Sequence, residues 1–168
     1  MKIFNLKQDI ILENERTRLS PLQLSDVEKL LPIAEKHNDL LKFSPSRFHN
    51  KRFLTNYINT ALRTKSLGIR YPFIIFDKKN QQYAGSTSFG NISNPNLRLE
   101  IGWTWITKEL QGTGLNQANK FLMLQYAFET LEFERVELKT DSRNLQSRRA
   151  MEKIGCTYEG ELRSHTLM

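Results

Sequence analysis

The stretch KELQGTGLNQANKFLMLQYAFETL, residues 108–131, places two glycines between a strand-like segment and a helical pattern. Gly112 and Gly114 stand one residue apart, directly before the apolar residues of the helix. Glycine costs backbone entropy, so it is typical of positions with positive φ or of a backbone that a ligand approaches closely. Amides at a helix N-terminus lack intrahelical partners and carry partial positive charge. The arrangement therefore favours either a tight turn or a phosphate-binding site.

Two familiar phosphate-binding loops do not match this turn. The P-loop ends in Gly-Lys followed by Ser or Thr, whereas residues 114–117 read GLNQ. The dinucleotide-binding fingerprint requires a third glycine three residues after Gly114, where this chain has Gln117. We therefore expect neither a P-loop nucleotide hydrolase nor a dinucleotide-binding domain.

The segments around the turn predict a strand followed by a buried helix. Alternation of apolar and polar residues indicates a strand over 97–106, with Glu100 on the face opposite the apolar side chains. The expected apolar face is formed by Leu97, Leu99, Ile101, Trp103 and Trp105. The helix over 115–131 is expected to bury a stripe at helical spacing, formed by Phe121, Leu124, Phe128 and Leu131.

The rest of the pattern predicts one α/β domain over residues 1–168 with a mixed sheet. Two helices are expected near 25–36 and 50–65, and two strands within 71–92. The C-terminal third predicts a strand over 135–142, a helix over 144–155 and a last strand over 157–168.

Composition narrows the function classes. The formal net charge is +7, but the basic residues are scattered and not interleaved with aromatic residues, so nucleic acid is not expected as the primary ligand. A phosphorylated small ligand fits this modest excess of positive charge. The single cysteine, the absence of a long apolar run and the charged N-terminus predict a cytoplasmic protein with no membrane segment. The three histidines have no ligand spacing, so no metal is expected.

Three stretches together resemble one enzyme family. QGTGLN resembles the acetyl-coenzyme A loop of the GNAT N-acetyltransferases, and LEIGWTWI resembles their fourth strand. RVELKTDSRNLQSRRAMEKIGCTYEGELR, residues 135–163, resembles the RimJ/RimL-like branch, whose best known members acetylate protein N-termini. The resemblance covers roughly residues 10–165. It implies the GNAT fold, with six to seven strands and about four helices, and transfer of acetyl from acetyl-CoA to a primary amine.

The resemblance implies positions for the cofactor and for the reaction. Amides of the turn would hold the pyrophosphate, from the residues Gln111, Gly112, Thr113, Gly114, Leu115 and Asn116. The backbone at Trp105 and Ile106 would pair with the pantetheine arm, and Asn144 would bond the arm from the other side or cap a helix. Glu100 is the candidate base, either directly or through water, and Ser147 is the candidate donor to the departing sulfur.

The acceptor site is less clearly marked. By resemblance, the loop between the first two helices builds the acceptor pocket, and the candidate lining residues are Phe43, Phe48, His49, Tyr71 and Ser88. The acceptor itself stays open between a protein N-terminal amine and a small amine such as an amino acid, polyamine or aminoglycoside.

Three departures from the family pattern keep a second hypothesis open. Asn116 stands where the loop usually ends in Gly or Ala, and Met151 stands where many members have Tyr. The usual final strand also has no counterpart after 157–168, and the sheet gap this leaves predicts pairing with another chain, as in a homodimer. The alternative is therefore a catalytically idle GNAT fold that binds acyl-CoA as a sensor or partner module.

Overall fold

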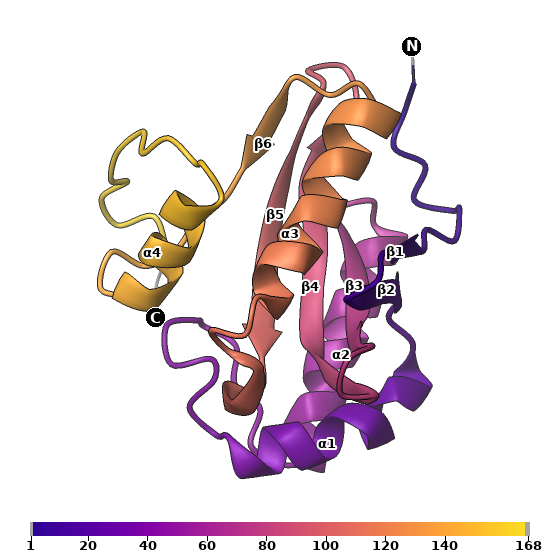
Figure 1. Ribbon diagram of the computed structural model, residues 1–168, viewed down its shortest axis with the longest axis vertical. Coiled ribbons are helices and arrows are strands. Elements are labelled where there is room, and N and C mark those ends of the chain that lie inside the picture. The colour runs from indigo at the N-terminus through magenta and orange to yellow at the C-terminus, as the bar shows by residue number, and fades with distance from the viewer. Residues whose placement is uncertain (1, 167–168) are drawn as a thin grey trace.

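The computed structural model describes residues 2–166, which form a six-stranded sheet with helices on both faces (Figure 1). Neighbouring strands are antiparallel, except that β5 and β6 run parallel. The predicted α/β class with a mixed sheet is confirmed. The strands follow one another across the sheet in chain order: β1 Leu12–Glu13, β2 Thr17–Pro21, β3 Arg70–Asp77, β4 Gln82–Ser93, β5 Arg98–Ile106 and β6 Arg135–Glu137.

Two helices, α1 Val27–Lys36 and α2 Lys51–Ser66, cover one face of the sheet. The side chain of Asn50 caps α2, where its Oδ1 accepts a hydrogen bond from the N–H of Phe53 at 3.1 Å. Leu54, Tyr57, Ile58 and Ala61 of α2 are buried against α1 and the sheet. Phe53 is 41% exposed, so it lies at the edge of this interface. No helix within residues 2–166 is long and apolar enough to cross a membrane.

The other face is covered by α3 Leu115–Gln125, which continues into a π-helical turn over Tyr126–Thr130 (Figure 1). The predicted buried stripe was wrong at two positions, because Phe121 is 61% exposed and Phe128 also faces solvent. The first residue of α3, Leu115, is fully buried and so sets which side of the helix faces the sheet. The positions one and two helical turns later lie on that same side. The buried apolar residues of α3, its extension and the position that follows are Leu115, Leu122, Met123, Ala127 and Leu131, and α3 also buries Asn119 and Lys120.

A bulge in β5 interrupts the predicted alternation. Gly102 pairs with Ser88 and Trp105 pairs with Ser86, so two residues of β5 lie opposite a single residue of β4. Trp103, within the bulge, has a φ of 51°, and its side chain is partly exposed.

The bulge changes the face to which later side chains belong. Leu99 and Ile101 lie in the core beneath α3, whereas Trp105 lies in the core beneath α1 and α2. The expectation that these residues share one face with Trp103 was therefore wrong. Glu100 lies on the same side of the sheet as Trp105, not opposite to it.

The C-terminal part is the least embedded in the domain. β6 has three residues, fewer than the strand predicted over 135–142. Asn144 caps α4 Leu145–Lys153, Gly155 follows it with a φ of 85°, and none of the residues of α4 is buried. Residues 156–166 contain no strand, so the strand predicted over 157–168 was wrong for its described part; residues 167–168 lie outside the described residues. Glu159 of this segment accepts hydrogen bonds from Arg135 of the edge strand β6, so the contact with the sheet is made by side chains.

Candidate functional site

The turn between β5 and α3 is open around both glycines. Gly112 and Gly114 have φ values of 75° and 85°, so both require the left-handed region that glycine adopts without strain. A Cβ on either residue would meet no atom within 4 Å, so packing does not select glycine here. α3 has no side-chain cap and no acidic residue in its first turn. The amides at its positive end are therefore free of side-chain acceptors and lie beside open space.

β5 has an unpaired edge beyond its short contact with β6. The two strands pair only between residues 98–100 and 135–137, and beyond this the chain leads from β6 to α4, away from β5 (Figure 1). Within the part of the chain that the structure describes, residues 101–106 therefore have no strand partner on the β6 side. Their peptide groups on that edge are available to a ligand that extends along the strand.

Two glutamines connect the end of β5 to α4. The Nε2 of Gln111 donates to the carbonyl oxygen of Ile106 at 2.8 Å, and its Oε1 accepts from the Nε2 of Gln146 at 2.8 Å. The start of α4 thus faces the glycine turn. There, the Oδ1 of Asn144 accepts from the N–H of Ser147 at 3.1 Å, so the expected capping role of Asn144 is observed.

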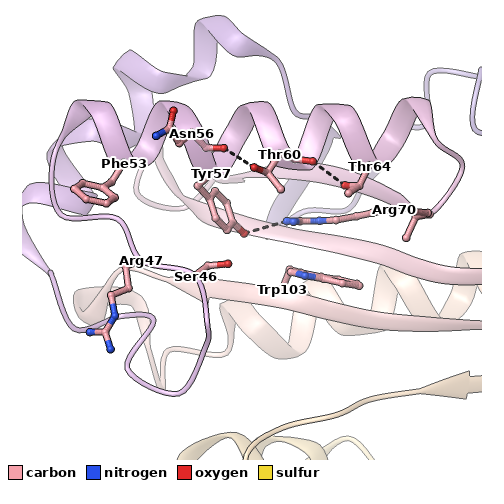
Figure 2. A pocket seen from close by; sticks show the side chains of 10 residues that line it. Ser46, Arg47, Phe53, Asn56, Tyr57, Thr60, Thr64, Arg70 and Trp103 are labelled. Atoms are coloured by element: carbon pink, nitrogen blue, oxygen red, sulfur yellow. Dashed lines mark hydrogen bonds between the residues drawn. The ribbon is translucent and has the colours of Figure 1, made fainter. Parts of the chain in front are cut away.

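A separate cavity of about 270 Å³ lies between α2 and β5 (Figure 2). Tyr57 forms part of its wall, and its hydroxyl oxygen accepts hydrogen bonds from Nη2 of Arg70 at 3.0 Å and Nε1 of Trp105 at 3.3 Å. The Trp103 ring lies against the guanidinium of Arg70, 4.9 Å from its Cζ (Figure 2). The complete lining is Ser46, Arg47, Phe53, Asn56, Tyr57, Thr60, Thr64, Ile69, Arg70 and Trp103.

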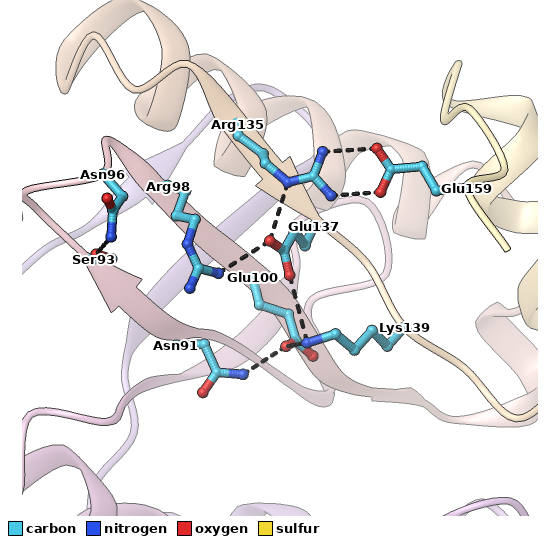
Figure 3. Close-up of polar contacts among 9 residues, drawn as sticks. All are labelled: Asn91, Ser93, Asn96, Arg98, Glu100, Arg135, Glu137, Lys139 and Glu159. Atoms are coloured by element: carbon cyan, nitrogen blue, oxygen red, sulfur yellow. Dashed lines mark hydrogen bonds and ion pairs between the residues drawn. The ribbon is translucent and has the colours of Figure 1, made fainter. Parts of the chain in front are cut away.

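Glu100 lies at the point where β5 and β6 begin to separate (Figure 3). Its carboxylate is largely buried, and its Oε2 accepts from Nδ2 of Asn91 at 2.7 Å and Nζ of Lys139 at 2.8 Å. The hydrogen bond to Glu100 raises the pKa of Lys139, which keeps that ammonium charged. Neither bond uses Oε1, which lies 3.1 Å from where a Cβ on Gly102 would stand. The missing side chain at Gly102 leaves room beside this oxygen.

Glu100 and the cavity belong to the same side of the sheet. Gly90 of β4 pairs with Arg70 on one side and with Glu100 on the other. A Cβ on Gly90 would approach the Trp103 ring to 2.2 Å, so this ring covers Gly90 between the two charged residues. The sheet face therefore carries a carboxylate, an indole and a guanidinium in sequence, from the point where β5 and β6 separate to the cavity.

Residues 16–157 match the sequence profile of the Acetyltransferase (GNAT) domain. The chain belongs to this family. YdaF, a proposed ribosomal N-acetyltransferase of Bacillus subtilis (strain 168), is 39% identical over 79 residues, which are 47% of this chain and 43% of that relative. The alignment thus spans less than half the length of YdaF. The predicted likeness to the RimJ/RimL-like branch is confirmed by this relative.

Solved structures support the fold of the GNAT domain. A proposed acetyltransferase from T. thermophilus is 30% identical, with a TM-score of 0.80, and the match covers 93% of this chain and 80% of that one. RimL, described as a ribosomal L7/L12 alpha-N-protein acetyltransferase, is 21% identical with a TM-score of 0.81, covering 96% and 88%. The latter likeness concerns the fold alone.

Within this GNAT domain, the predicted acceptor residues are dispersed. Phe48 is buried behind the cavity, 4.6 Å from the ring of Trp105, and Ser88 lies behind the wall as the acceptor of a bond from Nε of Arg70 at 2.7 Å. Both support the cavity without lining it. Phe43 is half-buried outside the lining.

Two further predicted acceptor residues lie elsewhere. His49 is exposed and packs on the ring of Phe53, at the margin of the cavity. Tyr71 lies on the opposite face of the sheet, fully buried in the core beneath α3, and its hydroxyl donates to the carbonyl oxygen of Gln8 at 2.8 Å. Burial raises the pKa of Tyr71. Tyr71 therefore does not line the cavity, because strand alternation directs its neighbour Arg70 to that side.

The sequence contained a signal for the cavity that we did not use. Positions 53, 56, 57, 60 and 64 recur at helical spacing and form one stripe of polar and aromatic residues on α2. This stripe lies beside the buried face of α2, and the stronger apolar pattern of that face made the stripe hard to recognise in the sequence. Trp103 was assigned to the core because the bulge could not be read from the alternation.

The residues of the glycine turn have different surroundings. The Oγ1 of Thr113 donates to the carbonyl oxygen of Leu110 at 2.7 Å, and Leu115 is a core residue. Asn116 keeps a buried Oδ1 that has no hydrogen-bond partner within residues 2–166. Trp105 and Ile106 direct their side chains into the two cores, so only their backbone lies at the unpaired edge of β5, and the carbonyl oxygen of Ile106 already accepts from Nε2 of Gln111.

The second turn of α3 buries a lysine. Lys120 is 5% exposed, and its Nζ donates to the Oγ1 of Thr104 at 2.8 Å. Burial lowers the pKa of Lys120 to about 7. No group of three or more His, Cys, Asp or Glu side chains within the described range is arranged to hold a metal ion.

Proposed function

We propose that this protein transfers the acetyl group of acetyl-CoA to a primary amine. The leading acceptor is a protein N-terminal amine, since the relative YdaF is named for ribosomal N-acetylation. A small-molecule amine is the other acceptor class. The observation that carries the proposal is the glycine turn: two left-handed glycines with open space beside them, at the uncapped start of a helix and next to an unpaired strand edge.

The residues present fit acetyl-CoA. A pyrophosphate requires several N–H donors and positive potential, which amides of residues 112–116 at the start of α3 supply. The pantetheine arm contains two amides, and the free edge of residues 101–106 offers peptide groups of matching chemistry. Asn144 and Ser147 lie at the start of α4, which the bond between Gln111 and Gln146 holds near the turn.

Each step of the reaction has a candidate group. An amine attacks only after it has lost a proton, and Oε1 of Glu100 is the carboxylate oxygen free to accept that proton directly or through a water. Lys139 and Asn91 hold the other oxygen and so fix the carboxylate. Backbone N–H groups at the end of β5 would stabilise negative charge on the carbonyl oxygen. The hydroxyl of Ser147 would donate to the sulfur as the C–S bond breaks.

Two residues favour a second candidate function. Asn116 places an amide where the phosphate loop of the family usually has a small residue, and Met151 of α4 cannot donate a proton to a sulfur. An acyl-CoA-binding module without turnover is therefore the alternative. It predicts binding of acetyl-CoA without release of free thiol.

The test combines a thiol-release assay with mass spectrometry of a panel of peptides and small amines. We expect acetyl-CoA-dependent thiol release with a mass gain on the acceptor amine. Glu100→Gln should lower kcat by about 10²-fold while leaving the affinity for acetyl-CoA unchanged. The matched control is Glu134→Gln, an exposed carboxylate just before β6, which should keep full activity. An unchanged rate in Glu100→Gln removes this residue from the mechanism, and binding without thiol release favours the idle module.

A further inference from the structure

Arg70 is a buried cation in the wall of the cavity. It is 4% exposed and lies between the rings of Tyr57 and Trp103, with Cζ 5.4 Å and 4.9 Å from their centroids. Its Nε donates to Oγ of Ser88 at 2.7 Å, and its Nη2 donates to the hydroxyl of Tyr57 at 3.0 Å (Figure 2). Neutral hydroxyls and aromatic rings thus surround a full positive charge.

The charge of Arg70 has no counter-ion among residues 2–166. None of the ion pairs formed by residues 2–166 includes Arg70. The nearest carboxylate along the sheet face, Glu100, is bound to Lys139 and separated from Arg70 by the Trp103 ring over Gly90. A buried charge is costly unless an opposite charge or a set of hydrogen bonds compensates it.

The guanidinium also retains unused donors. An arginine offers five N–H groups, of which the bonds to Ser88 and Tyr57 use two. The cavity lining contains no Asp or Glu, and Arg47 adds a second guanidinium (Figure 2). The cavity is therefore suited to an anion, and a planar carboxylate matches the fork of a guanidinium through two parallel N–H···O bonds.

We propose that Arg70 binds a carboxylate of the acceptor, with Trp103 as a platform beside it. This inference rests on the proposed function, because it names the substrate class of the same reaction. The acceptor is an amine that carries a carboxylate nearby: an acidic side chain next to a protein N-terminus, or the α-carboxylate of a free amino acid. A volume of about 270 Å³ accommodates one such group and excludes a folded surface. The new N–C bond forms at the acceptor amine as the thioester C–S bond breaks, and the amine proton leaves through the base.

The test measures binding and turnover separately. Peptides with Glu or Gln at the second position, and free glutamate or glutamine amide, are titrated by calorimetry and then assayed for kcat/KM. We expect the acid to exceed its matched amide by at least tenfold in both measurements. The peptide and free amino-acid arms identify which source of the carboxylate the site takes.

Variants connect the preference to Arg70. Arg70→Gln should abolish the preference for the acid while leaving the affinity for acetyl-CoA unchanged, and Arg70→Lys should retain part of it. Arg63→Gln, an exposed arginine of α2 outside the cavity, is the matched control and should retain all of it. If Arg70→Gln does not fold, Arg70→Lys alone decides by its reduced preference. Equal use of acids and amides by the unaltered protein overturns the inference and leaves the acetyltransferase proposal intact. Preferential binding of acids without turnover supports the inference and contradicts acetyl transfer.

Discussion

Lys120 provides a quantitative test of the environment around the start of α3. Its pKa is lowered to about 7 by burial, against an ordinary value near 10.5. Between these two values the unfolded chain holds a proton that the folded protein lacks, so the free energy of unfolding rises with pH. The two pKa values of Lys120 differ by about 3.5. This difference lowers the free energy of unfolding at pH 7 by at most about 4 kcal/mol. Lys120→Met removes this cost and loses one hydrogen bond of about 1 kcal/mol to Thr104, which keeps its bond to Thr87.

We therefore expect Lys120→Met to stabilise the protein by about 1–3 kcal/mol at pH 7. Urea unfolding at pH 7.5 and 8.5 measures the effect. The unaltered protein should gain about 1 kcal/mol more than the variant over this interval, because only it contains Lys120. Lys153→Met, an exposed lysine of α4, is the control and should follow the unaltered protein. Equal pH dependence in Lys120→Met and the unaltered protein would refute the reasoning.

Three further substitutions test separate parts of the structure. Gly114→Ala places a side chain on a backbone with a φ of 85°, so the free energy of unfolding should fall by about 1–2 kcal/mol. Calorimetry should also show at least tenfold weaker binding of acetyl-CoA. Unchanged affinity contradicts a role for the turn in binding. Asn144→Ala removes the cap of α4, so amide exchange in α4 should increase while the urea midpoint barely moves, since α4 buries no residue; a large midpoint shift contradicts this. Gly90→Ala should displace Trp103, cost about 1–3 kcal/mol and lower acceptor affinity; a stable variant with unchanged acceptor KM would refute the packing of Trp103 on Gly90.

The sequence predicted best what neighbouring residues determine. The strand before the glycines, the turn and the following helix are local features, and the structure has all three where the pattern indicated them. The left-handed conformations of Gly112 and Gly114 agree with the residue type, because glycine alone adopts them without strain. Asn50 and Asn144 cap their helices for an equally local reason.

What the sequence did not predict depends on contacts between distant segments. The bulge in β5 arises from pairing with β4, and it moves Trp103 and Trp105 away from the face that simple alternation gives. Arg70 was missed as a site residue because it stands at the first position of a strand, where a basic residue usually faces solvent. Only the folded chain brings Tyr57 and Trp103 against it.

The strand predicted after α4 was wrong for a related reason. Residues 157–166 alternate enough to resemble a strand, but a strand forms only where another strand offers hydrogen bonds. β6 has only three residues, and the segment contacts this edge strand through the ion pair between Glu159 and Arg135, without backbone pairing among the described residues. Beyond those three residues β6 leaves β5, which gives the unpaired edge of β5 on which the proposed function depends.

Calorimetric titration of the purified protein with acetyl-CoA, with ATP and NAD as competing phosphorylated ligands, tests the central claim most directly. The open glycine turn and the free edge of β5 predict selective binding of acetyl-CoA at micromolar concentration, with a stoichiometry of one per chain. Absence of binding, or equal binding of ATP and NAD, would contradict the assignment of the glycine turn and the edge of β5 to acetyl-CoA.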